Sequence, residues 1–181
     1  NSLMPTAAAL RKVVTLDRSM VRPDEPCPPF AATPSPNRGR RAASKIDTIV
    51  IHCTAGGTTA GAMSRLLDPS AKASSHIVIP KWGTPGEPSR TQRLVDDEFA
   101  AWHCRAVPFQ GVRGVNGRSL GIEIVNTAQV GDEYTDWQVE ETARWCRYWC
   151  GKHPIQHIVT HGYLDPSRRE DPCVTFPWDK F

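Results

Sequence analysis

The chain has 181 residues, of which 39% are hydrophobic and 23% charged, so it can build a packed core and is not a disordered polymer. Its net charge of +3 does not indicate a nucleic-acid binder, and no apolar run approaches the roughly 18–20 residues that span a bilayer. The length fits one domain with an extension. We expect a monomer with no nucleic-acid partner and no membrane insertion.

Residues 1–44 are predicted to form an N-terminal arm or linker. Residues 1–3 resemble a cloning scar, and two basic residues interrupt residues 4–16, so no signal peptide is visible. Residues 22–45 contain six prolines and no apolar periodicity, which is typical of an extended segment. This arm is expected either to link to a further module or to wrap back over the domain that follows.

Residues 45–181 are predicted to be a single catalytic domain in which strands and helices alternate. One strand, 119–126, places Leu120, Ile122 and Ile124 on one face and therefore Glu123 on the other. The full set of expected strands is 46–52, 75–79, 93–95, 119–126 and 156–161. Helices are expected from Thr58 or Thr59 to about Leu67 and from about Thr135 to Gly151, with a short helix or turn over 96–102.

Two cysteines of the second helix, Cys146 and Cys150, are expected to be thiols. Helix geometry holds side chains four residues apart at roughly 5–6 Å between Cβ atoms, whereas a disulfide needs about 3.5–4.5 Å. With His153 and His157 the pair superficially resembles a zinc-finger ligand set. The spacing is too tight, however, and Pro154 breaks the segment, so we reject it as a metal site.

Two histidines are the strongest candidates for a functional site. His52 and His161 each end a buried strand, which is where sites collect in α/β sheets. Asp171 supplies a third candidate ligand. Two imidazoles and one carboxylate, with a fourth position open to water, are the donor set of a catalytic zinc site. Since 109 residues separate the histidines, spacing alone leaves open whether either ring is simply a buried, hydrogen-bonded side chain.

The order of motifs over about residues 45–181 resembles the zinc-dependent N-acetylmuramoyl-L-alanine amidases of type 2, a family that includes phage lysins, wall-recycling amidases and peptidoglycan recognition proteins. The motifs that carry the resemblance are IVIHCTAG, SSHIVI, AWHC, NGRSLGIEIVN, YTDWQVE, IVTHGYLDPSRREDPC and FPW. The resemblance implies a central mixed β-sheet flanked by helices. It also implies hydrolysis of the amide bond between N-acetylmuramic acid and the L-alanine of the stem peptide.

The resemblance also implies roles for single residues. His52, His161 and Asp171 match the family's ligands for one zinc ion. Glu123 matches the acid that activates water, and a carboxylate in an apolar strand has the raised pKa that suits proton transfer. Arg169 stands where the family usually has a lysine that stabilises the tetrahedral intermediate. The alternatives are an edge-strand surface carboxylate for Glu123 and a solvated loop charge for Arg169.

Three further residues are assigned through the same motifs. His76 and His103 match histidines that line the family's groove, so both are predicted to contact substrate, although His103 could equally be a partly buried ring beside Trp102. Cys173 stands where the family commonly has glycine and is an alternative metal ligand if Asp171 turns away. Cys53 follows His52 on an extended strand, so its side chain is expected to point away from the metal.

The expected activity is therefore that of a peptidoglycan hydrolase acting on wall or soluble muropeptide. The absence of a visible signal peptide favours a phage endolysin, made in the host cytoplasm and acting on the wall. The second reading is a secreted bacterial cell-wall amidase. The alternative function is a non-catalytic peptidoglycan-binding module, and the presence of both Asp171 and Glu123 favours the enzyme.

Overall fold

The computed structural model describes residues 12–41, 45–172 and 176–178. The strands are β1 (Val13–Thr15), β2 (Phe30–Ala32), β3 (Arg38–Arg40), β4 (Thr48–Cys53), β5 (Ile77–Ile79), β6 (Thr91–Arg93), β7 (Phe99–Ala101), β8 (Pro108–Phe109), β9 (Val112–Arg113), β10 (Ser119–Ile124) and β11 (His157–Thr160). The α-helices are α2 (Thr59–Leu66), α3 (Asp136–Lys152) and α4 (His161–Leu164). Short 3-10 turns lie at η1 (Arg18–Met20), η2 (Pro69–Ala71) and η3 (Val115–Arg118).

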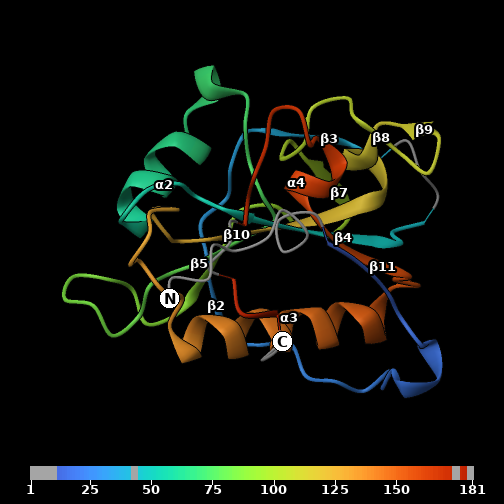
Figure 1. Cartoon of the computed structure of the whole chain (residues 1–181), viewed down its shortest axis with the longest axis horizontal. Helices are drawn as coiled ribbons and strands as arrows, with labels where there is room; N and C mark the ends of the chain where they lie inside the picture. The colour runs from blue at the N-terminus through green and yellow to red at the C-terminus, as the bar shows by residue number, and fades with distance from the viewer. Residues whose placement is uncertain (1–11, 42–44, 173–175, 179–181) are drawn as a thin grey trace, which may run out of the picture.

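A seven-stranded sheet in the order β1-β11-β4-β10-β5-β6-β2 forms the centre of the molecule. Figure 1 shows it as a middle layer, with α3 along one face and α2 and α4 on the other. Parallel pairs join β11, β4, β10 and β5, and also β6 and β2, whereas β1 pairs antiparallel to β11 and β6 antiparallel to β5. The expected mixed sheet flanked by helices is confirmed.

The four parallel strands bring their carboxyl ends to one edge of the sheet. This edge is where functional groups collect in α/β folds, because loops diverge there and leave a crevice. In the pairing of β4 with β10, His52 lies directly beside Glu123. The pairing of β4 with β10 thus places His52 and Glu123 side by side, whatever the conformation of the loops.

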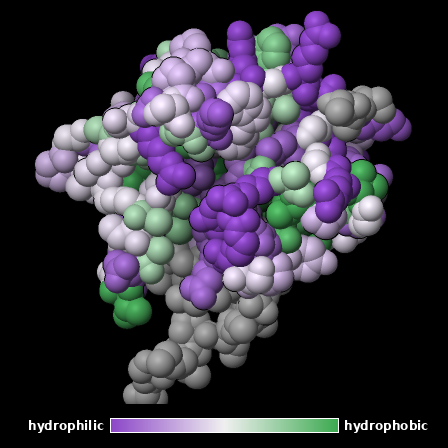
Figure 2. Space-filling model, turned by 90° about the horizontal axis from the view of Figure 1, so that it is seen from above, coloured by the Kyte–Doolittle hydropathy of each residue, from purple (hydrophilic) through white to green (hydrophobic). Residues whose placement is uncertain are grey.

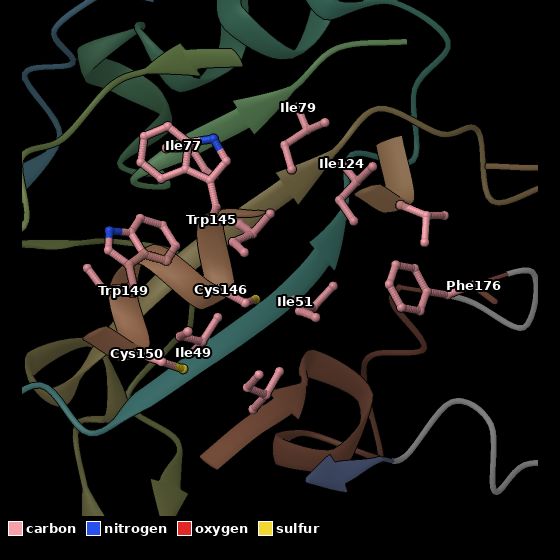
Figure 3. Close-up of a cluster of buried hydrophobic side chains, with 14 of the residues drawn as sticks. Ile49, Ile51, Ile77, Ile79, Ile124, Trp145, Cys146, Trp149, Cys150 and Phe176 are labelled. Atoms are coloured by element: carbon pink, nitrogen blue, oxygen red, sulfur yellow. The ribbon is translucent and has the colours of Figure 1, made fainter. Parts of the chain in front are cut away.

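The main hydrophobic core lies between the sheet and α3. Ile49 and Ile51 of β4 pack with Ile124 of β10 against Trp145 and Trp149, and all five are fully buried (Figure 3). The helix begins with a capping box, in which the side chains of Thr135 and Gln138 each bind the other's backbone N–H. This core uses the side of each strand that faces α3 and leaves the opposite side for the site.

The cysteines of this core behave as expected. Cys146 and Cys150 are buried free thiols on the face of α3 that meets the sheet. Burial raises the pKa of both thiols, for Cys150 to about 11. Cys53 packs in the same cluster and so points away from the opposite face of the sheet. Cys173 lies outside the described residues.

Residues 12–41 pair with the rest of the molecule. β1 pairs with β11 and β2 pairs with β6, so this segment supplies the outermost strand on both sides of the central sheet. β3 pairs with β7 in a separate ladder. The Arg18 guanidinium donates to the carbonyls of Cys150, His153 and Ile155, at the end of α3. Of the two expectations for the arm, wrapping back over the domain matches these contacts.

We predict that Gly151→Ala destabilises the protein through this segment. A Cβ atom at position 151 would overlap the carbonyl oxygen of Arg22, which is backbone and cannot rotate away. Alanine normally favours a helix over glycine by roughly 1 kcal/mol, so stabilisation would be the outcome if the segment did not pack here. Urea unfolding should instead give a lower free energy of unfolding for Gly151→Ala than for the parent. In a protein that lacks residues 1–23, the same substitution should raise the free energy of unfolding, because the Arg22 carbonyl is then absent.

Two details of the predicted elements are wrong. Residues 99–101 form β7 rather than helix or turn, because Phe99–Ala101 pairs with β3 of the N-terminal segment, a partner remote in sequence. The third strand occupies 91–93 rather than 93–95, since both β5 and β2 pair with Thr91–Arg93. The limits of β6 and β7 depend on the strands with which they pair, and the hydrophobicity of their own residues does not predict those limits.

Candidate metal centre

His52 and His161 meet on the face of the sheet opposite α3. β4 carries His52, and His161 begins α4 directly after β11. Thr160 caps α4 by accepting from the Tyr163 N–H, which fixes the turn that aims His161 across the strand. The two Nδ1 atoms lie 2.9 Å apart, and the side chains are 1% and 8% exposed. The rings therefore converge through one nitrogen each.

Asp171 completes this cluster. Its Oδ2 lies 3.0 Å from Nδ1 of His52 and 3.1 Å from Nδ1 of His161. The Gly162 N–H donates to the Asp171 carbonyl and ties the segment to the start of α4. Burial alone would raise the pKa of the carboxyl, but its contacts with the two imidazoles outweigh burial and hold the pKa well below its ordinary value. The group is thus an anion at neutral pH.

These three atoms fit a small divalent cation. Their separations of 2.9–3.1 Å are close to the roughly 3.3 Å between ligand atoms that sit about 2.0–2.1 Å from a tetrahedral zinc ion. Two ring nitrogens and one carboxylate oxygen are the donor types that catalytic zinc sites use. Among the described residues, His52, His161 and Asp171 form one of two groups whose candidate ligand atoms all lie within 4.8 Å of one another.

The second group is His52, His103 and Cys104, which the sequence did not suggest. It uses the other ring nitrogen of His52, whose Nε2 lies 2.8 Å from Nδ1 of His103, while the Cys104 sulfur lies 3.5 Å from that same atom. Burial, followed by the charges of Asp171 and Glu123, raises the pKa of the Cys104 thiol well above its ordinary value. The three ligand atoms of the first group lie closer together, 2.9–3.1 Å from one another, than the Cys104 sulfur lies to His103, and this geometry favours the first group as the metal site.

Glu123 lies beside His52 on the same face of the sheet. Its Oε2 is buried and has no hydrogen-bond partner among the described residues. Burial, reinforced by the negative charge of Asp171, raises the pKa of this carboxyl well above its ordinary value. Arg65 and Arg169 act in the opposite direction through their charges. A buried acid with one unpartnered oxygen beside His52 has the properties of a proton carrier.

A cavity of about 730 Å³ opens from this cluster towards solvent. Its lining includes His52, Glu123, His161 and Asp171 together with a rim of cationic side chains. The cations are Arg65, Lys72, Arg105, Arg168 and Arg169. Figure 2 views the molecule from above, onto the face that carries α2 and α4, and shows strongly hydrophilic residues gathered at its centre. The cavity therefore suits an anionic, polar ligand.

The remaining predicted site residues separate into two groups. Arg169 is exposed and His103 is 9% exposed, and both line the cavity. His76 is fully buried and does not line it. The Gly121 N–H donates to Nδ1 of His76, while its Nε2 lies 2.9 Å from the Phe99 carbonyl. This placement gives His76 a structural role rather than a substrate contact.

The buried His76 predicts acid sensitivity. Burial, and then the charge of Arg41, lowers the pKa of His76 to about 3. Below pH 6.5 the unfolded chain therefore binds a proton that the folded chain does not, and stability falls by about 1.4 kcal/mol per pH unit. Between pH 7 and pH 5 we expect His76 alone to remove about 2 kcal/mol. Urea unfolding should show a correspondingly smaller pH loss for His76→Asn.

Residues 42–174 match the family described as N-acetylmuramoyl-L-alanine amidase. The chain belongs to this family. The resemblance drawn from the seven motifs is thereby confirmed, and so is the mixed α/β fold that it implied. Among the described residues, no helix is both long enough and apolar enough to cross a membrane.

Individual relatives agree with the family assignment. N-acetylmuramoyl-L-alanine amidase AmiD of Escherichia coli K12 is 28% identical over 149 residues, covering 75% of this chain and 52% of AmiD. The 1,6-anhydro-N-acetylmuramyl-L-alanine amidase AmpD of the same strain is 31% identical over 112 residues, covering 61% of this chain and 57% of AmpD. This amidase chain thus spans about half the length of the curated relatives that it matches.

A solved structure of E. coli AmiD superimposes with a TM-score of 0.66 at 27% identity, over 79% of this chain and 59% of that one. That structure is a complex with the substrate anhydro-N-acetylmuramic acid-L-Ala-D-gamma-Glu-L-Lys. AmpDH3 of Pseudomonas aeruginosa gives the same TM-score at 25% identity, over 92% of this chain and 64% of that one. The chain thus shares its fold with both of these structures.

Proposed function

We propose that this chain hydrolyses the amide bond between N-acetylmuramic acid and the L-alanine of the peptidoglycan stem peptide, using one zinc ion held by His52, His161 and Asp171. The observation that carries the proposal is the convergence of three ligand atoms within 3.1 Å of one another beside a buried acid. A non-catalytic recognition module has no use for that acid. The structure of AmiD with a muropeptide supports the substrate class.

A zinc ion held by His52, His161 and Asp171 would lower the pKa of a coordinated water to about 7 and would polarise a nearby carbonyl group. Glu123 takes a proton from the attacking water and delivers it to the nitrogen of the leaving L-alanine. The same carboxyl can do both because it lies in the cavity beside His52 and its Oε2 has no competing hydrogen-bond partner among the described residues. Its raised affinity for a proton favours the first transfer.

Arg169 supplies positive charge to the oxygen that becomes negative as the amide carbonyl is attacked. The side chain is exposed on the cavity rim, and its charge already acts on Glu123 and His52. Arginine cannot release a proton at working pH, so its contribution is electrostatic. This role differs from that of Glu123, which must both gain and lose a proton.

We predict that Arg169→Ala lowers kcat by about 10²–10³-fold, because a fixed charge at a developing oxyanion is worth this much. Arg169→Lys keeps the charge and should retain most of the rate. Steady-state kinetics on a soluble muropeptide separate the outcomes. A higher KM with unchanged kcat would show that Arg169 holds substrate equally in the ground and transition states.

The function is tested by the turbidity of purified cell walls. Addition of the protein should clear the suspension, a chelator should stop clearing, and added zinc should restore it. Mass spectrometry of the fragments should show free N-terminal L-alanine on released stem peptides. Sedimentation of protein with walls that stay turbid would contradict hydrolysis and favour the recognition module.

The biological setting belongs to the same proposal. The chain acts on peptidoglycan either as a phage endolysin or as a bacterial cell-wall amidase, and it works as a monomer. Comparing rates on intact walls and on a soluble anhydromuropeptide separates wall lysis from recycling of wall fragments. Sedimentation equilibrium of the purified chain tests the oligomeric state.

A further inference from the structure

The ring of His103 connects His52 to the sheet on the side away from the other two ligands. Nδ1 of His103 lies 2.8 Å from Nε2 of His52, and Nε2 of His103 lies 3.0 Å from the Ser119 hydroxyl. His103 is 9% exposed, and Ser119 is fully buried. Two imidazoles and one hydroxyl thus form a continuous chain that ends on β10.

The position of the other ligand atoms fixes where the protons lie in this chain. His52 offers Nδ1 to the same point as His161 and Asp171, and a nitrogen that binds a metal carries no proton. The proton of His52 must then be on Nε2, which donates to Nδ1 of His103. His103 in turn carries its proton on Nε2 and donates to Ser119. With the proton of each ring on Nε2, His52 donates to His103 and His103 donates to Ser119, and Nδ1 of His52 stays free to bind the metal.

Strand β10 is shaped to receive this ring. Ser119, Gly121 and Glu123 alternate along one face of the strand. A Cβ atom at Gly121 would lie 2.6 Å from Cγ and 2.7 Å from Nδ1 of His103, so only glycine leaves room for the imidazole there. The ring is therefore held by packing as well as by hydrogen bonds, and it stands next to the acid of the proposed mechanism.

We propose that His103 is a positioning residue, which holds His52 in the tautomer and orientation that bind zinc. The proposal rests on the zinc site put forward above. Partners that accept from the free N–H of a ligand histidine commonly contribute about 10–100-fold in metal affinity. Assigning His103 this role also explains why it is the groove histidine that faces a ligand, whereas His76 is bonded to the backbone.

Two isosteric variants separate this role from a packing role. In His103→Asn the side-chain oxygen takes the place of Nδ1 and can still accept from His52. In His103→Gln the amide instead takes the place of Nε2, so the bond to Ser119 survives and the bond to His52 is lost. We expect His103→Gln to weaken zinc binding by about 10–100-fold, measured by competition with a chromophoric chelator, and His103→Asn to stay within about threefold of the parent.

Two further variants serve as controls. His157→Gln changes a half-buried histidine that contacts Thr15 and Gln110 at the other end of β11, and zinc affinity should not change. Cys104→Ala should also leave it unchanged. Weakening by Cys104→Ala together with both His103 variants would overturn the proposal, because His103 and Cys104 would then be ligands themselves.

The outcomes separate this inference from the function on which it rests. If the parent protein binds no zinc at micromolar concentration, the zinc site itself fails. If the parent binds zinc and His103→Gln binds it equally well, the site stands and the positioning role fails. Nitrogen-15 spectra of the zinc-loaded parent give a second readout, in which the His52 proton should reside on Nε2.

Discussion

Glutamine at position 123 is expected to lower turnover of a muropeptide by about 10²–10⁴-fold while zinc stays bound. The amide has the shape of the acid but cannot take a proton from water and pass it to the leaving nitrogen. Because Oε2 of Glu123 has no partner among the described residues, the exchange breaks no hydrogen bond there. The stability of the fold should not fall. Kinetics and metal content measured on one preparation test both parts.

Glu141→Gln is the matched control for this experiment. Glu141 is also a buried glutamate, but its Oε1 accepts from Thr91 and Trp145 on the α3 side of the sheet. This variant should lose stability and keep activity, the reverse of Glu123→Gln. Loss of metal from Glu123→Gln would contradict the assignment and make Glu123 a ligand rather than a proton carrier.

Replacing His161 by alanine is expected to remove both the zinc ion and the activity. Only two of the three converging atoms remain, and a histidine with one carboxylate does not close a tetrahedral site. A metal ion contributes several kcal/mol to this class of reaction, and about 4 kcal/mol corresponds to roughly 10³-fold in rate. Elemental analysis after gel filtration measures the zinc, and muropeptide hydrolysis measures the rate.

The same variant decides between the two clusters that share His52. His161→Ala leaves His52, His103 and Cys104 intact, so a metal held by that group would survive the change. Retention of one zinc ion per chain in His161→Ala, with its loss in Cys104→Ala, would assign the metal to the second cluster. The shorter separations within the first cluster, 2.9–3.1 Å against 3.5 Å between the Cys104 sulfur and His103, argue for the first.

The sequence predicted those parts of the fold that each carry their own signal. β4 reads as a run of buried apolar residues, and β10 as an alternating strand with one acid, so both strands and the placement of Glu123 follow from the pattern. The long helix α3 was expected from Thr135 to Gly151 and extends over Asp136–Lys152, where the capping box and the apolar stripe define it. The strand ends on which His52 and His161 lie suggest that the two rings converge, but their 109-residue separation leaves this open from the sequence alone.

Other parts depend on partners that are distant in sequence. β1, β2 and β3 are three residues each, and they become strands only because β11, β6 and β7 offer them a ladder. No periodicity could reveal them. Likewise, the motifs do not distinguish His76 from His103, since both match histidines that line the family's groove. Only the packing shows that one ring contacts a candidate ligand and the other a carbonyl group.

The placement of β1 and β2 at the edges of the sheet affects whether copies of this protein associate in concentrated solution. An outermost strand presents unpaired backbone groups that can recruit a second chain, and prolines, which cannot extend a ladder, discourage this. β2 is preceded by Pro28 and Pro29 and followed by Pro34. A shortened protein beginning at residue 42, where the family match starts, would instead end its sheet at β11 and β6. We therefore expect the N-terminal segment to limit association of this chain with other copies through the edges of its sheet.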